Sequence, residues 1–242
     1  MIENPSCAII SSMNSISHNI ELILRDIEEA AKGCGRNPDD IQLMAVSKTK
    51  PMEMLMEAYA GGMRLFGENR VQEGVEKRKE LPSDARIELI GHLQSNKVKQ
   101  AVGNFSCIQS VDSLKLAGKI NKRAGELGLV QDILLELKTA EADEAKTGFA
   151  SVDGLLEALD EVAAMKNLRV RGLMTIAPFV QDEKIIRKSF RLCRQVFERA
   201  AQEFILDKFD TLSMGMSGDF KIAIEEGATL VRVGSSIFGT RY

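Results

Sequence analysis

The chain has 242 residues, of which 44% are hydrophobic and 28% are charged, and its formal net charge is −3. This composition is typical of a soluble globular protein, and the length suits one α/β barrel of about 250 residues. The small net charge, the 5% aromatic content and the absence of tryptophan disfavour partners such as nucleic acid or an anionic membrane.

The cysteines and the N-terminus indicate a reducing compartment. No two cysteines form a CxxC pair and only two histidines are present, so we expect neither a zinc site nor a disulfide framework. Residues 1–5 lack a basic segment, and the apolar run 7–10 is too short for a signal peptide or a membrane span. We therefore predict a cytoplasmic protein. The cysteines are Cys7, Cys34, Cys107 and Cys193.

Eight apolar, β-branched runs alternate with stretches of helical periodicity, which predicts an α/β fold. Near-continuous apolar runs are typical of parallel strands buried on both faces. Eight strand–helix alternations favour a single closed (β/α)8 TIM-type barrel, with a doubly wound open sheet as the alternative. The runs are 41–47, 63–67, 86–91, 105–111, 132–137, 170–177, 211–216 and 229–234.

An extra helix is predicted before the first strand. Its apolar positions recur at helical spacing, and Gly33 and Gly35 end it. We expect this helix on the outside of the barrel or across its bottom. We find no linker or repeat, so residues 1–242 are predicted to form one domain, with 141–146 as a solvated loop. The apolar positions are Ile16, Ile20, Ile23, Leu24 and Ile27.

A lysine and two Ser/Gly turns follow the first and the last two predicted strands. Lys48 ends the first run, and turns containing Gly and Ser follow the seventh and eighth. Barrel closure would bring these strand ends together, in the region where such barrels often bind phosphate. The predicted phosphate donors are Ser213, Ser217, Gly234 and Ser235.

Lys48 and Arg232 are the two residues that indicate which chemistry the site performs. A lysine at a buried strand end either forms a salt bridge or serves as a Schiff-base amine. Arg232 lies inside an apolar run. It either pairs with a carboxylate in the barrel or donates to the ring nitrogen of pyridoxal phosphate. An arginine donor would leave that nitrogen unprotonated and the cofactor a weaker electron sink.

Three other polar residues each have a possible structural role and a possible functional role. Ser217 serves the phosphate, the N-cap of the next helix, or both. Asn69 orients a ligand or caps a helix, and His92 is structural or takes part in chemistry. The basic runs 77–79 and 97–99 are interpreted as solvated helix faces.

Several segments, in order, resemble the YggS/PROSC-type pyridoxal-phosphate homeostasis proteins. The resemblance implies a barrel similar to the N-terminal domain of bacterial alanine racemases. It implies that Lys48 carries the cofactor as an aldimine, that Arg232 faces the ring nitrogen and that the two turns hold the phosphate. Lys138 stands where many relatives have Asn. The segments are 45–48, 66–69, 91–97, 110–112, 146–148, 171–178, 213–217 and 231–235.

Three functions remain open at this stage. The first is a monomeric protein that stores or delivers pyridoxal phosphate, with amino acids and apo pyridoxal-phosphate enzymes as transient partners. The second is a racemase-like enzyme acting on a small amino acid. Alanine racemases use a catalytic tyrosine from a further β-domain, and neither Tyr59 nor Tyr242, the two tyrosines of this chain, is an obvious match, which disfavours this function. The third is a sugar-phosphate enzyme in which Lys48 forms the Schiff base with substrate. The predicted site residues are Lys48, Asn69, His92, Ser213, Ser217, Arg232, Gly234 and Ser235.

Overall fold

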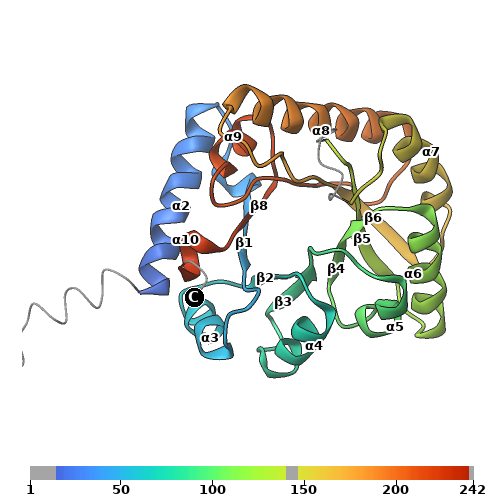
Figure 1. Cartoon of the computed structure of the whole chain (residues 1–242), viewed down its shortest axis with the longest axis horizontal. Coiled ribbons are helices and arrows are strands. Elements are labelled where there is room, and N and C mark those ends of the chain that lie inside the picture. The colour runs from blue at the N-terminus through green and yellow to red at the C-terminus, as the bar shows by residue number, and fades with distance from the viewer. Residues whose placement is uncertain (1–14, 140–146, 240–242) are drawn as a thin grey trace, which may run out of the picture.

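A closed barrel of eight parallel strands forms the centre of the protein, in a computed structural model that describes residues 15–139 and 147–239 (Figure 1). The strands follow each other around the barrel in chain order, and β8 pairs in parallel with β1 to close it. The strands are β1 Gln42–Val46, β2 Leu65–Glu68, β3 Arg86–Leu89, β4 Cys107–Val111, β5 Gln131–Glu136, β6 Leu168–Met174, β7 Thr211–Ser213 and β8 Leu230–Val233.

Each strand is followed by a helix, which confirms the predicted (β/α)8 architecture and excludes the open sheet. The strand ends differ from the predicted runs by a few residues. The helices that follow the strands are α3 Met52–Ala60, α4 Val71–Glu80, α5 Val98–Ala101, α6 Leu114–Glu126, α7 Val152–Ala163, α8 Glu183–Glu203, α9 Phe220–Glu225 and α10 Ser235–Phe238. Short 3₁₀ turns occupy Pro38–Asp40 and Ser95–Lys97.

The predicted extra helix is α2, Ile16–Gly33, and it packs on the outside of the barrel. Figure 1 shows it beside α9, α10 and α3, so it covers the seam where the barrel closes. The Asn19 side chain donates to the carbonyl of Ile237 at 2.9 Å, which fixes α2 to α10. Leu24 is half exposed and is not part of the buried stripe. No helix in the described ranges is long and apolar enough to cross a membrane.

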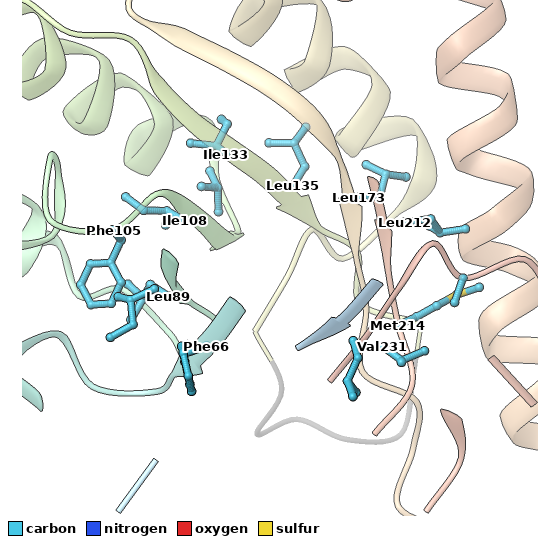
Figure 2. Close-up of a cluster of buried hydrophobic side chains, with 14 of the residues drawn as sticks. Phe66, Leu89, Phe105, Ile108, Ile133, Leu135, Leu173, Leu212, Met214 and Val231 are labelled. Atoms are coloured by element: carbon cyan, nitrogen blue, oxygen red, sulfur yellow. The ribbon is translucent and has the colours of Figure 1, made fainter. Parts of the chain in front are cut away.

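Strand residues alternate between the barrel interior and the layer of helices. Outward apolar side chains such as Phe66, Ile133 and Val231 belong to the main hydrophobic core (Figure 2). Inward ones form two small clusters of their own. These clusters are Met44, Leu65 and Leu230, and Cys107, Leu134 and Met174.

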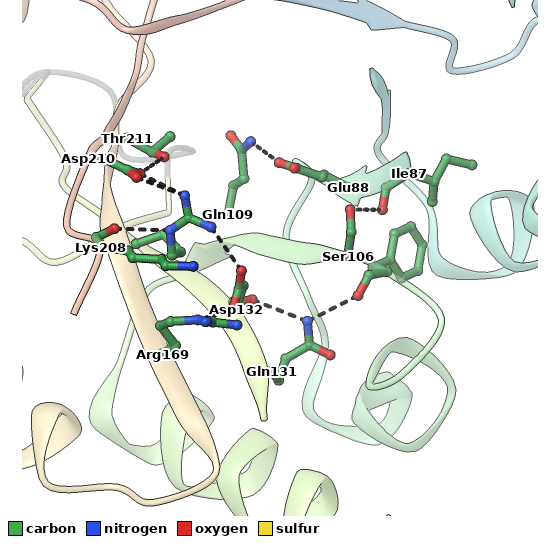
Figure 3. Close-up of polar contacts among 12 residues, drawn as sticks. Ile87, Glu88, Ser106, Gln109, Gln131, Asp132, Arg169, Lys208, Asp210 and Thr211 are labelled. Carbon is green, nitrogen blue, oxygen red and sulfur yellow. Dashed lines mark hydrogen bonds and ion pairs between the residues drawn. The ribbon is translucent and has the colours of Figure 1, made fainter. Parts of the chain in front are cut away.

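Ion pairs connect the amino-terminal ends of β5, β6 and β7 (Figure 3). Arg171 contacts Asp132 at 3.1 Å and Asp210 at 2.8 Å, and Arg169 contacts Asp132 at 2.7 Å. Ion pairs therefore connect the strands at the amino-terminal end of the barrel. Functional sites of such barrels lie at the opposite end, where the strands have their carboxyl ends.

Some sequence predictions lie outside the described ranges. They are the lack of a signal peptide in residues 1–14, the solvated loop 141–146 and the position of Tyr242. The single domain over residues 1–242 stays a prediction.

Gly172 lies where β6 leaves no room for a side chain against β7, which yields a stability prediction. A Cβ at this position of β6 would lie 1.8 Å from the carbonyl oxygen of Thr211, its partner in β7. We expect Gly172→Ala to lower the free energy of unfolding by about 3 kcal/mol, since the strands must separate. Urea denaturation measures this.

Gly118→Ala on α6 is the matched control, because no atom beyond its chain neighbours and the backbone of its own helix lies within 4 Å of the added Cβ. It should leave stability unchanged or raise it by up to about 1 kcal/mol. Equal midpoints for the two variants would contradict the close approach of β6 and β7.

Candidate functional site

A cavity of about 460 Å³ lies at the carboxyl ends of the strands. Six of the eight predicted site residues line it, and they come from β1, β2, β7 and β8 or the loops that follow them. Barrel closure thus brings together residues from both ends of the chain, as expected from the sequence. The six are Lys48, Asn69, Ser217, Arg232, Gly234 and Ser235.

Lys48 lies two residues beyond β1 and continues the inward-facing alternation of that strand. Met44 and Val46 precede it at a spacing of two, and Met44 belongs to an interior cluster. Val46 and Lys48 both line the cavity. The strand pattern therefore accounts for a primary amine at the cavity wall.

The two Ser/Gly turns are joined to each other. The Gly234 N–H donates to the Ser217 hydroxyl at 3.2 Å, and the Arg232 N–H donates to the carbonyl of Gly215 at 3.0 Å. Gly215 has a φ of 91°, and a Cβ there would lie 2.6 Å from the Ala223 Cβ. A glycine is required at this turn, which places Ser217 and Gly218 beside Gly234 in the cavity wall.

Ser217 does not cap the helix that follows it. Residue Asp219 occupies the N-cap position of α9, and no side-chain capping bond forms there. The capping interpretation of Ser217 is therefore wrong, because the hydroxyl instead accepts from Gly234. The alternative that Asn69 caps α4 is also wrong, since Arg70 is its N-cap.

Arg232 points from β8 into the barrel, with 3% of its surface exposed. Its Nη1 donates to the Ser213 hydroxyl at 2.6 Å, and its Nη2 donates to the Thr175 carbonyl at 2.9 Å. Both acceptors are neutral. Burial lowers the pKa of Arg232 to about 10, so the guanidinium keeps its charge at neutral pH.

A chain of hydrogen bonds continues from Arg232 into the barrel interior. The Ser213 hydroxyl donates to Gln109 Oε1 at 2.7 Å, and Gln109 Nε2 donates to Glu88 Oε2 at 2.6 Å (Figure 3 shows the second bond). Because arginine can only donate, the Ser213 hydroxyl must accept from Arg232 and donate its own hydrogen onward, and Gln109 in turn accepts with its oxygen and donates with its nitrogen. The direction runs from a cation at the cavity to a carboxylate near the floor, and burial raises the pKa of Glu88.

Two predicted residues lie outside the cavity lining given by the described part of the chain. Ser213 is buried below the cavity and contacts Arg232. His92 is half exposed, and its Nδ1 lies 3.1 Å from a carboxylate oxygen of Asp112. Lys138, the second amine considered from the sequence, is also absent from this lining.

Several lining residues were not predicted from the sequence. Lys50 donates to the carbonyls of Phe238 and Gly239, at 3.1 Å each, and so connects the β1 loop with α10. Ile176 and the wholly exposed Phe179 form an apolar wall after β6. Lys50 follows Lys48 by two residues in the chain, but the turn at Thr49 separates it from the alternation of β1, so the strand pattern gave no signal for it.

The chain is similar to known proteins in sequence and in fold. Residues 12–242 match the family described as the alanine racemase N-terminal domain. An alanine racemase of Clostridium difficile 630 has the same fold, with a TM-score of 0.73 at 17% identity, over 90% of this chain and 56% of that one. The fold and the cavity define a barrel of the alanine racemase N-terminal type.

Relatives of about 40% identity show which family within this class the chain belongs to. The pyridoxal phosphate homeostasis protein of Vibrio alginolyticus is 40% identical over 235 residues, covering 95% of this chain and 99% of that protein. PipY of Synechococcus elongatus PCC7942, solved with PLP bound, gives a TM-score of 0.77 at 38% identity, over 88% and 100% of the two chains. The chain belongs to the pyridoxal phosphate homeostasis protein family, as its sequence segments predicted.

Ser213 forms hydrogen bonds inside the barrel, whereas Ser235 lines the cavity, so the two serines should affect stability differently. We expect Ser213→Ala to lower the free energy of unfolding of the ligand-free protein by about 1–3 kcal/mol, because buried groups of Arg232 and Gln109 lose their partner. Ser235→Ala, at an exposed position, should change it by no more than about 0.5 kcal/mol. Urea denaturation followed by circular dichroism measures both. Equal stabilities of the two variants would contradict an interior role for Ser213.

Proposed function

We propose that this chain binds pyridoxal phosphate at the mouth of the barrel and serves intracellular vitamin B6 homeostasis. The observation that carries the proposal is the cavity itself, which collects a lysine amine, a buried arginine and two joined Ser/Gly turns. The names of its relatives, and the PLP bound to PipY, support the same function.

The cavity suits the size and the polarity of this cofactor. Its volume of about 460 Å³ falls within the usual range for small-molecule pockets, roughly 300–1,000 Å³. Hydroxyls and backbone groups of Ser217, Gly234 and Ser235 gather at one part of the wall, where a phosphate would find donors. Val46, Ile90, Ile176 and Met216 provide apolar surface for a pyridine ring.

In this proposal, Lys48 holds the cofactor covalently. Its amine condenses with the aldehyde of pyridoxal phosphate, so that a C=N bond forms and one water is released. The bound cofactor supplies an electron-withdrawing ring, whose strength depends on the protonation of the ring nitrogen.

Arg232 is the group we assign to the ring nitrogen. It is held from inside the barrel by Ser213 and Thr175, so its position does not depend on the ligand. A guanidinium can only donate, and it therefore favours an unprotonated ring nitrogen. The cofactor then suits storage and transfer better than deep carbanion chemistry.

We extend the proposal to the partners and the location. The cavity opens at the surface beside the exposed Phe179, which gives free amino acids and an apo acceptor enzyme a route to the cofactor. We place this exchange in the cytoplasm and assign the role to a monomer. A reducing compartment agrees with the three free cysteines of the described chain, namely Cys34, Cys107 and Cys193.

The alternative is a racemase-like enzyme with the same cofactor. The likeness to alanine racemase supports the fold alone. Among described residues, no tyrosine lines the cavity, and the Tyr59 hydroxyl donates to Asp84 at 2.7 Å on the barrel's exterior. The described residues therefore offer no tyrosine that could act as a second base opposite Lys48.

Lys48→Ala tests the covalent assignment. The wild type, mixed with pyridoxal phosphate and then freed of unbound cofactor, should absorb in the visible or near-visible range. Lys48→Ala treated in the same way should lack this absorption while keeping its far-ultraviolet circular dichroism. Borohydride reduction followed by peptide mass mapping should place the adduct on Lys48 in the wild type.

Lys138→Met is the matched control, since Lys138 is absent from the cavity lining in the described residues. It should keep the absorption of the wild type. An adduct mapped to Lys138 would overturn the assignment. A wild type that gains no such absorption would favour the sugar-phosphate alternative.

Racemase activity should be absent or far below ordinary enzymatic rates. Removal of an α-proton needs both an electron sink and a positioned base, and Arg232 weakens the sink. NMR detection of deuterium exchange at the α-carbon, across a panel of amino acids, measures this. Turnover of about 1 s⁻¹ or faster, lost in Lys48→Ala, would instead establish the enzyme.

A further inference from the structure

A buried polar cluster lies behind the cavity wall, between the barrel and α4. It joins Ser47, just after β1, and Glu68, at the end of β2, to Glu73 and Lys77 of α4. Ser47 and Glu68 are fully buried, and Lys77 is only 8% exposed. The expectation that residues 77–79 form a solvated helix face is therefore wrong at Lys77.

Lys77 uses its ammonium group to connect three separate segments. Its Nζ donates to the Ser47 carbonyl at 2.8 Å, to Glu68 Oε1 at 2.7 Å and to Glu73 Oε1 at 2.7 Å. The Ser47 hydroxyl donates to the same Glu68 oxygen at 2.7 Å. All three ammonium donors are engaged, so the end of β1 is fixed relative to β2 and α4.

The same cluster also holds the residue on the other side of Lys48. The backbone N–H of Thr49 donates to Glu73 Oε1 at 2.6 Å. Thr49 has a φ of 63°, a left-handed conformation that is costly for a β-branched residue. The bond to Glu73 is therefore one interaction that maintains an unfavourable turn immediately after Lys48.

Stability alone is a weak reason for this cluster. A buried ion pair seldom stabilises a protein more than a well-packed apolar pair of similar volume would. Burial raises the pKa of Glu68, while the hydrogen bonds from Lys77 and Ser47 oppose that rise. In addition, Glu68 Oε2 is buried without a hydrogen-bond partner among the described residues, which costs further free energy.

We propose that Glu73, acting with Lys77 and Glu68, is a positioning residue for Lys48. The cluster fixes the peptide groups on both sides of Lys48, so that its amine enters the cavity from a set backbone position. Glu73 supplies the acceptor for Thr49, and Lys77 supplies the donor for Ser47. The inference rests on the proposed function, since it assigns a purpose to the orientation of Lys48.

Substitutions on α4 test the inference with a matched control on the same helix. Glu73→Ala removes the acceptor of Thr49, whereas Glu76→Ala removes only an exposed ion pair with Lys79. Glu73→Gln keeps an oxygen for Thr49 and serves as the conservative rescue. Each variant is mixed with pyridoxal phosphate, and the rate of absorption change and the equilibrium affinity are measured beside thermal unfolding of the ligand-free protein.

We expect Glu73→Ala to slow covalent capture and to weaken affinity by about tenfold, a difference of about 1.4 kcal/mol. Glu76→Ala should match the wild type in both, and Glu73→Gln should recover most of the loss. Should Glu73→Ala fail to fold, Glu73→Asp replaces it, because its carboxylate is one methylene shorter and should give a loss in the same direction.

Two results would overturn the positioning role. One is capture by Glu73→Ala at the rate and affinity of the wild type, and the other is a loss in Glu73→Gln equal to that in Glu73→Ala. Failure of the wild type to form any absorbing adduct would instead overturn the proposed function, so the two failures are distinguishable.

Discussion

The parallel pairing of β1 with β8 is the contact on which the site depends. It places Met44 opposite Arg232 and Ala45 opposite Val233, although these residues are about 190 positions apart in the chain. The loops beyond the paired strands carry Lys48 on one side and Gly234 and Ser235 on the other. Because parallel strands end at the same edge, this pairing places Lys48 beside Gly234 and Ser235 in the cavity wall.

Hydrogen bonds among polar side chains in the barrel interior then hold Arg232 in place at the cavity. The chain from Arg232 through Ser213 and Gln109 to Glu88 crosses the barrel with every step buried. Such a chain is favourable only when each donor has an acceptor, since an unpaired buried group is costly. Arg232 is consequently placed by the barrel and presented to the cavity in a set orientation.

The wall around Lys48 is supported from outside the barrel as well. Lys77 and Glu73 reach from α4 to the peptide groups beside Lys48, and Lys50 reaches to the last turn of α10. The amine we assign to the cofactor thus emerges from a segment held on two sides. A loop anchored in this way loses little conformational entropy when a ligand binds, which favours retention of a small cofactor.

Within residues 15–139 and 147–239, neither His92 nor Tyr59 lines the cavity. His92 Nδ1 lies 3.1 Å from a carboxylate oxygen of Asp112, and the Tyr59 hydroxyl donates to Asp84 on the exterior. In the function we propose, Arg232 disfavours a protonated ring nitrogen. These features support our proposal of a protein that keeps and hands over a cofactor.

The sequence by itself determined the eight strands, their parallel order and the strand ends that meet at the site. Buried parallel strands require apolar, β-branched runs, and the chemistry stands directly after them, as at Lys48 and Gly234. Only the tertiary structure decided where Ser213 and Lys77 lie. Ser213 ends its strand facing inward, one level below the cavity, where Arg232 needs an acceptor. Lys77 sits in a basic run like any solvated one, and it is buried because the folded barrel brings Glu68 and the Ser47 carbonyl within reach of its ammonium group.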